Sequence, residues 1–220
     1  MKIKEKSTAR AWLVAVSMGY GHQRTAYALK DLSPDGKIIN ANDYPGMSEK
    51  DKLFWGKSQK FYEFISNFQN IPLIGKLLFY IYDYFQKIFS FYPRRDLSRS
   101  NFVLRQIFSL LKKGWGINLI ETLKKNPLSL ITTFFTAAFM AEFFNYPSDI
   151  YCVICDADIS RTWAPLNPFQ SKIKYLASTQ RSAERLALYG VKKENIFLTG
   201  YPLPKENIGS DMEIVKRDLG

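Results

Sequence analysis

The chain has 220 residues, 46% of them hydrophobic, which suits one large domain or two small ones with a buried core. Its N-terminal stretch is charged and the first apolar run is short, so we expect no secretory signal. Lys and Arg number 31 against 20 Asp and Glu, and the net charge of +11 favours an anionic partner surface, while two cysteines argue against a disulfide framework.

The first predicted element is a buried β-strand at residues 11–18, where the run AWLVAVSM is nearly all apolar. A helix is predicted to follow at residues 22–32. Two glycines in the turn between them allow a sharp bend and a close approach of a ligand to the backbone. The helix N-terminus offers unpaired N–H groups to an anion or a hydroxyl. The turn is therefore a candidate acceptor or phosphate loop, formed by Ser17, Gly19, Tyr20, Gly21 and Arg24.

His22, the only histidine of the chain, lies at this junction. An imidazole titrates close to neutral pH, so a histidine at a binding turn is a candidate general base. A turn that only connects two elements is the alternative interpretation. The dinucleotide fingerprint Gly-x-Gly-x-x-Gly is excluded, because Arg24 stands where its third glycine would be.

Residues 44–126 are predicted to form a helical, aromatic-rich insertion. Its centre, residues 71–92, has a helical period with its polar residues on one narrow stripe. Charged residues interrupt this segment, so we expect a helix that lies in the membrane interface rather than a transmembrane span. A helix pair buried in the protein is the alternative. The residues expected at the membrane are Leu77, Ile81, Phe85, Ile88, Arg94 and Arg95.

Basic residues concentrate between Lys87 and Lys125, where nine Lys and Arg are opposed only by Asp96 and Glu121. Such a concentration indicates a surface that binds an acidic membrane leaflet or nucleic acid. A solvated basic face without a partner is the alternative. We prefer the membrane and expect no nucleic acid, because the basic residues flank an amphipathic helix rather than a recognised nucleic-acid module.

Five further strands are predicted at residues 37–42, 128–135, 150–156, 172–178 and 195–200, and two further helices at 136–144 and 179–189. Gly190 is predicted to end the last helix. Strands that alternate with helices indicate an α/β fold, with a Rossmann-like parallel sheet and helices on both faces. Ligands of such sheets bind beyond the carboxyl ends of the strands, where the glycine turn, Asp43 and Asp156 would all lie.

Asp156 and Asp158 follow the fourth predicted strand. A carboxylate at a strand end suits a general base or a group that orients a hydroxyl, although Asp158 at the start of a short helix also fits a capping role. Cys152 and Cys155 form a C-x-x-C within this strand. Side chains three apart on a strand point to opposite faces, so we expect two buried thiols rather than a disulfide or a zinc site.

Three ordered segments resemble the monogalactosyldiacylglycerol synthases and the processive diacylglycerol glucosyltransferases. Residues 17–29 (SMGYGHQRTAYAL) are similar to their opening Gly-x-Gly-His … Ala-x-Ala-Leu. Residues 153–163 (VICDADISRTW) look like their Val-Val-Thr-Asp … Trp strand. The pieces LYGV and NIFLTGYPL, within residues 188–203, are similar to their Gly-Val … Ile-x-Val-Thr-Gly-Ile-Pro-Val.

The resemblance implies the N-terminal, acceptor-side domain of a GT-B glycosyltransferase at residues 1–205, with 206–220 beginning the linker to a donor domain outside the chain. It implies an inverting, metal-independent transfer from a nucleotide sugar (a UDP-sugar) to a lipid acceptor, in the cytoplasm at the inner face of the membrane. The residues it implies for the site are His22 and Asp156 as catalytic groups, with Asp158, Arg161 and Trp163 as secondary ones.

Several features depart from the family pattern. Tyr20 stands where these loops usually carry a small residue, and residues 132–135 stand where relatives carry a polar or histidine-containing turn. The insertion at 44–126 is also longer and more aromatic than expected for the family. We expect the isolated chain to bind no nucleotide sugar tightly and to need a donor-domain subunit. A membrane-bound scaffold subunit without chemistry is the alternative function, and the fold alone is also compatible with a nucleotide-sugar 2-epimerase.

Overall fold

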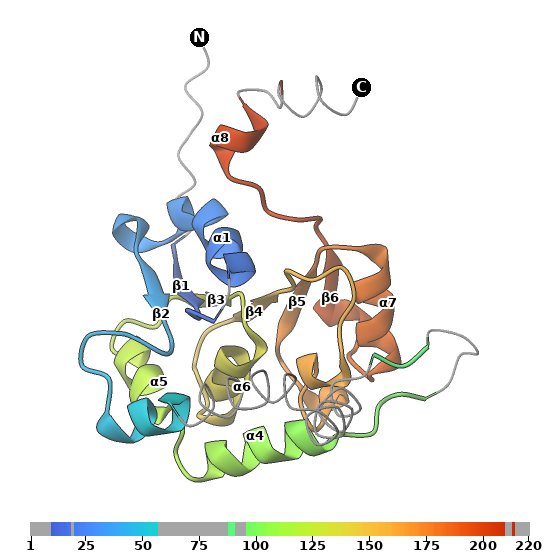
Figure 1. Cartoon of the computed structure of the whole chain (residues 1–220), viewed down its shortest axis with the longest axis horizontal. Helices are drawn as coiled ribbons and strands as arrows, with labels where there is room; N and C mark the ends of the chain where they lie inside the picture. Colours follow the sequence, from blue (N-terminus) through green and yellow to red (C-terminus); the bar gives the residue numbers. More distant parts are fainter. Residues whose placement is uncertain (1–9, 19, 57–87, 91–95, 210–212, 214–220) are drawn as a thin grey trace, which may run out of the picture.

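The computed structural model describes residues 10–18, 20–56, 88–90, 96–209 and 213. Within them, six strands form one sheet in the middle of the molecule (Figure 1). Each strand lies inside a range that the sequence predicts, so the α/β, Rossmann-like fold is confirmed. The strands are β1 (Ala11–Ala15), β2 (Ile38–Asn40), β3 (Ser129–Thr132), β4 (Ile150–Val153), β5 (Lys174–Ala177) and β6 (Ile196–Leu198).

The strand order is β2-β1-β3-β4-β5-β6, and every neighbouring pair is parallel. The winding of the chain therefore reverses between β1 and β3. At such a switch point, the connections leave the two strands on opposite faces of the sheet and open a crevice at their carboxyl ends. Val14 of β1 pairs with Thr132 of β3, so the turns after these two strands begin side by side.

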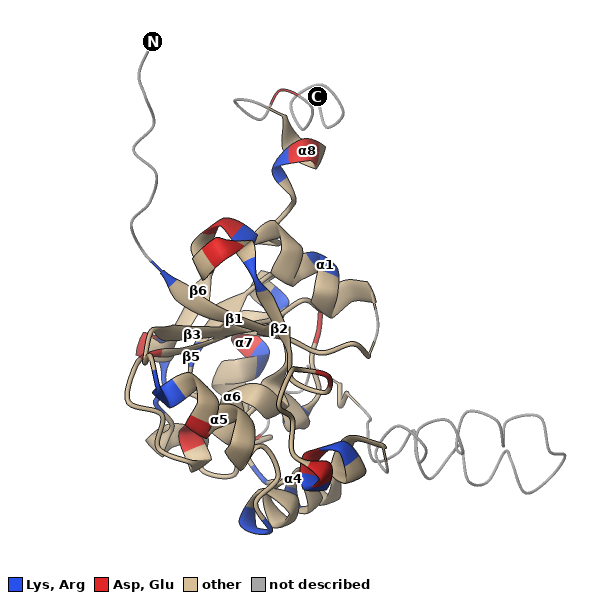
Figure 2. Ribbon diagram, turned by 90° about the vertical axis from the view of Figure 1, so that its left-hand side faces the viewer, with Lys and Arg blue, Asp and Glu red and all other residues tan. Residues whose placement is uncertain are grey.

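Helices cover both faces of the sheet (Figure 2). On one face, α1 (Tyr20–Ala28) packs on β1, and Leu13, Ala15 and Ala26 form a small apolar cluster there. The alternate side chains of β1 enter the main core on the other face. The helices that contribute to that core include α4 (Phe102–Lys112), α5 (Ile117–Lys124), α6 (Phe135–Phe143) and α7 (Gln180–Leu188).

The ends of the helices follow local signals. Helix α1 begins two residues earlier than predicted and gives way to a short 3-10 turn at Lys30–Leu32. Thr179 caps α7 through a capping box with Ser182, which satisfies two terminal N–H groups. Gly190 has a φ of +92°, the left-handed conformation of a helix stop, so its predicted role is confirmed.

The described parts of the insertion are largely helical. Residues 49–56 form a helix, and α4 and α5 lie in the described part that begins at residue 96. Leu104, Ile107 and Leu111 of α4 are buried in the main core, so this part of the insertion belongs to the folded domain. The predicted interface helix at 71–92 lies mostly outside the described residues and stays a prediction.

None of the helices in the described residues combines the length and the apolar character that a membrane span requires.

Candidate functional site

The candidate site lies at the carboxyl ends of β1, β3 and β4, at the switch point of the sheet. His22, in the first turn of α1, is half-buried there. Its Nδ1 lies 2.7 Å from the backbone oxygen of Thr133, the residue that follows β3. The Sγ of Cys155, which follows β4, lies 3.0 Å from the same nitrogen. The side chain that follows β1 is therefore held by groups that follow two other strands, β3 and β4.

The turn after β3 supplies the main contact of the imidazole. The buried hydroxyl of Thr132 accepts a hydrogen bond from the Phe134 N–H at 3.2 Å and donates one to the Phe134 oxygen at 3.1 Å. The Thr133 N–H is bonded to the oxygen of Val14 at 3.1 Å, which ties the turn to β1. This turn holds the Thr133 carbonyl toward His22, in the place where the family was expected to carry a histidine or another polar group.

Aromatic rings border the imidazole. The Phe134 ring lies edge-on to it with centroids 4.9 Å apart, and the Trp163 ring is tilted against it at 6.4 Å. The structure thus brings Trp163, a predicted site residue, next to His22. Its own exposure is 5%, so it forms a wall of the site rather than an accessible contact.

Charge at the site is set by burial and by Asp156. Desolvation lowers the pKa of His22 below its usual 6.5, while the hydrogen bond to Thr133 and the negative charge of Asp156 raise it. The pKa of Asp156 is raised by desolvation and lowered in turn by His22. His22 is therefore neutral at pH 7, as a general base must be, and it has a carboxylate close enough to stabilise its protonated form.

The prediction that Cys155 is a buried residue of the strand is wrong. The sequence predicts both cysteines inside a strand as buried thiols, and Cys152 is fully buried. Strand β4 ends at Val153, so the alternation of side chains stops before Cys155, which is half-buried beside His22. Both thiols are free, as predicted. No sequence signal points to this contact except that Cys155 precedes Asp156.

The glycine loop is only partly described, since Gly19 lies outside the described residues. The Ser17 N–H donates to the side-chain oxygen of Asn42 at 2.8 Å, and the Ser17 hydroxyl accepts from Gln23 at 3.1 Å. These bonds join the end of β1 to the loop after β2 and to α1. Gly21 lies in the first turn of α1, and a Cβ built on it meets no atom within 4 Å.

We predict that Gly21→Ala leaves the fold intact and raises the free energy of unfolding by about 0.5 kcal/mol, because alanine favours a helix over glycine. Any ligand that approaches the backbone at this turn is expected to bind more weakly to the variant. Gly116→Ala is the contrasting control, since Gly116 has a φ of +83° and its added Cβ would collide with Met140. Urea unfolding measures both, and a destabilised Gly21→Ala would show that the protein itself needs this glycine.

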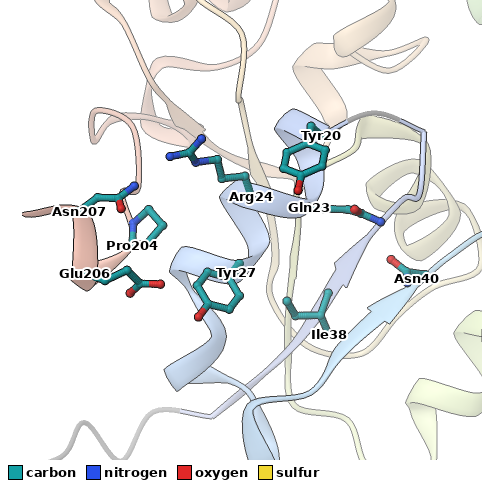
Figure 3. A pocket seen from close by; sticks show the side chains of 9 residues that line it. All are labelled: Tyr20, Gln23, Arg24, Tyr27, Ile38, Asn40, Pro204, Glu206 and Asn207. Atoms are coloured by element: carbon teal, nitrogen blue, oxygen red, sulfur yellow. The ribbon is translucent and has the colours of Figure 1, made fainter.

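Tyr20 and Arg24 do not face His22. They line a separate pocket of about 460 Å³ between α1, β2 and α8 (Lys205–Ile208), shown in Figure 3. Tyr20 is 84% exposed at its rim. Tyr27 lies farther along the same face of α1, near Glu206 (Figure 3). Of the predicted loop residues, Tyr20 and Arg24 thus line the pocket, and Ser17 is bonded to Gln23, another residue of its lining.

Asp158 forms ion pairs inside the domain. Its oxygens accept from Arg185 at 2.9 and 3.2 Å and from Arg181 at 2.6 Å, and its Oδ1 also accepts from the Ile159 N–H. Desolvation raises the pKa of Asp158, but these donors outweigh it and hold the pKa below its usual value. Asp158 therefore connects the loop after β4 to α7.

Arg161 also forms its hydrogen bonds within the folded domain. Its guanidinium is buried and donates to the backbone oxygens of Ser98, Ala164 and Pro165 at 2.8, 2.5 and 2.9 Å. Burial lowers its pKa to about 10. The contact with Ser98 connects the insertion to the loop after β4, and all three printed hydrogen bonds of the guanidinium go to the backbone.

Of the residues expected at the membrane, only Ile88 lies within the described part of the chain, and it is 41% exposed. Leu77, Ile81, Phe85, Arg94 and Arg95 lie outside it. No group of three or more His, Cys, Asp and Glu in the described ranges is arranged to hold a metal ion.

Comparison with protein-family models, with curated proteins and with solved structures finds no match.

Proposed function

We propose that this chain is the acceptor-binding half of a membrane-associated glycosyltransferase, which moves a sugar from a nucleotide sugar to a lipid. The observation that carries the proposal is the position of the only histidine. His22 lies half-buried at the switch point of a parallel sheet and is neutral at pH 7. The negative charge of Asp156 raises the pKa of His22 and so favours its protonated form. Such a crevice is where ligands of these sheets bind.

A hydroxyl that attacks a sugar must lose its proton as the new bond forms. His22 accepts that proton in this proposal, and Asp156 stabilises the imidazolium that results. The nucleotide sugar, a UDP-sugar, is held by a donor-binding domain outside residues 1–220, as a later part of the same polypeptide or as a partner subunit. The chain by itself is therefore proposed to bind the acceptor and to depend on that domain for turnover.

The membrane part of the proposal rests on charge and exposure. Nine basic residues between Lys87 and Lys125 would attract an anionic leaflet, and the described Ile88 and Phe89 are each 41% exposed beside them. Peripheral attachment at the inner leaflet would bring a lipid hydroxyl to the carboxyl edge of the sheet. An apolar helix lying in the interface would add binding energy in proportion to the area it buries.

Flotation with anionic and with neutral liposomes tests the membrane part. We expect the protein to float with anionic vesicles, and a variant with Leu77, Ile81 and Phe85 changed to Ser to lose most of that binding. Ile117→Ser is the control, because Ile117 is an exposed apolar residue (44%) on α5, outside the predicted interface helix at residues 71–92. Failure of the wild type to float with either vesicle would contradict the proposal.

The acceptor part can be followed with one NMR signal, because a tag-free protein has a single histidine. Diacylglycerol in the vesicles is expected to shift the His22 Cε1–H resonance, whereas vesicles without it should not. Binding to vesicles with no response of His22 would leave a membrane scaffold as the function instead of an acceptor site.

The pH dependence of the site follows from the direction of the His22 shift. The base form is lost as the pH falls through a pKa below 6.5, so transfer should decline only in acid. Asp156→Asn removes a charge that raises this pKa, and we expect the titration midpoint of the Cε1–H signal to move to lower pH. A midpoint that stays in place or rises would show that Asp156 does not act on His22.

A further inference from the structure

We propose that Cys155 and the Thr132–Phe134 turn are positioning groups that fix His22 as the tautomer with hydrogen on Nδ1 and the lone pair on Nε2. The positional part concerns the structure of the free protein. Only the further statement that Nε2 removes the acceptor proton rests on the proposed function.

The tautomer follows from the partner of Nδ1. A carbonyl oxygen can only accept a hydrogen bond, and the Thr133 oxygen lies 2.7 Å from Nδ1. Nδ1 therefore carries the hydrogen. Nε2 then carries the lone pair, and among the described residues it makes no hydrogen bond. A neutral imidazole held in this way presents one basic atom to a ligand, on the side of the ring away from the β3 turn.

Cys155 occupies the other approach to Nδ1. Burial, with a smaller effect of the Asp156 charge, raises the pKa of its thiol to about 12, so the sulfur is a neutral S–H. The thiol lies 3.8 Å from the Thr133 oxygen, within reach of a weak hydrogen bond to the same acceptor. At 3.0 Å from Nδ1, the sulfur is a second acceptor for the Nδ1 hydrogen beside that oxygen. Cys155 is thus neither a nucleophile nor a metal ligand here.

Thr132 holds the acceptor in place. Its side chain is fully buried, and both of its hydrogen bonds go to the backbone of Phe134. The bond from the Phe134 N–H fixes the peptide group that contains the Thr133 carbonyl, and the bond to the Phe134 oxygen fixes the next peptide group. Rotation of the imidazole by 180° would put a carbon against that oxygen and break the bond, and the edge-on ring of Phe134 resists such a rotation.

The proton-transfer step balances with this assignment. As the acceptor oxygen bonds to the anomeric carbon, its hydrogen passes to Nε2 and the bond from that carbon to the nucleoside diphosphate breaks. The leaving group carries away the electron pair. The Nδ1 hydrogen remains on the ring throughout, and the Thr133 carbonyl and Asp156 stabilise the positive charge that the imidazole gains.

Long-range ¹H–¹⁵N correlation of the tag-free protein at pH 8 tests the assignment directly, because His22 gives the only imidazole signals. We expect Nδ1 to resonate as a protonated nitrogen and Nε2 as an unprotonated one. In Thr132→Val and Cys155→Ala the alternative tautomer should increase by about three- to tenfold, the effect of one lost hydrogen bond. Cys155→Ser, which retains an acceptor for the Nδ1 hydrogen at the same position, should restore the wild-type pattern.

Cys152→Ala is the matched control, since Cys152 is the other free cysteine and is buried in β4. It is expected to cost stability without changing the tautomer, which separates positioning from general loosening of the core. A wild-type protein with hydrogen on Nε2, or Cys155→Ala and Thr132→Val variants that both match the wild type, would overturn the inference. The proposed function fails separately, if the tautomer is as stated but diacylglycerol never shifts the His22 signals.

Discussion

Asp158→Ala is expected to lower the free energy of unfolding by about 3–5 kcal/mol, the range for breaking a buried ion pair by removing one partner. Arg185 is only 1% exposed, and two of its nitrogens bond to the Asp158 carboxylate. The substitution takes away the carboxylate that balances this buried positive charge. The loop after β4, which carries Cys155 and Asp156, would lose its link to α7 at the same time.

Urea unfolding, followed by circular dichroism, measures the effect. Asp149→Ala is the matched control, because Asp149 pairs with Lys174 at 2.9 Å but is 51% exposed, and such surface pairs contribute about 1 kcal/mol or less. Adding Arg185→Met to Asp158→Ala should recover much of the loss, since the buried charge is then removed as well. A single Asp158→Ala variant as stable as Asp149→Ala would mean that Asp158 serves a ligand rather than the fold.

His22→Asn is expected to reduce sugar transfer by about 10²–10⁴-fold, the usual contribution of a general base. The assay contains the donor-binding domain, and the loss should appear in kcat with a small change in KM for the lipid, because asparagine retains the size and polarity of the side chain but not its basicity. The remaining activity should no longer depend on pH in the acid range where His22 titrates.

Asp149→Ala also serves as the control for activity, since Asp149 precedes β4, at the opposite edge of the sheet from His22. It should transfer sugar at the wild-type rate. Asp156→Asn should retain more activity than His22→Asn, because it removes the charge that stabilises the imidazolium but leaves the base. A His22→Asn protein with an unchanged kcat would exclude His22 as the base and leave Asp156 as the candidate.

The order of the elements could be predicted from the sequence because each strand is a short apolar run that contrasts with its neighbours. All six strands are confirmed, although each is shorter than predicted. The run at 150–156 shows why. The apolar residues continue as far as Cys155, but Val153 is the last residue of β4 that pairs with a residue of β3 or β5. Hydropathy reports burial, whereas strand ends depend on where hydrogen-bonding partners stop.

The candidate site could be predicted only in part. The sequence predicts His22 and Asp156, because a lone histidine at a glycine turn and a carboxylate at a strand end stand out by residue type. The Thr133 contact could not be found in this way, since every residue has a backbone carbonyl and only the fold aims this one at His22. Asp158 and Arg161 are residue types that are common in functional sites. Here the Asp158 carboxylate instead pairs with Arg185, and the Arg161 guanidinium donates to backbone carbonyls.

The sequence by itself determined that the chain forms an α/β sheet with a basic, aromatic-rich insertion, because hydropathy period and net charge are properties of local residue order. The tertiary structure alone decided which chemical groups meet. Strand order placed the turns after β1 and β3 side by side, and this brought together residues 22, 133 and 155, more than 100 positions apart in the case of His22 and its partners. Contacts of that kind depend on register and packing, which no local pattern encodes.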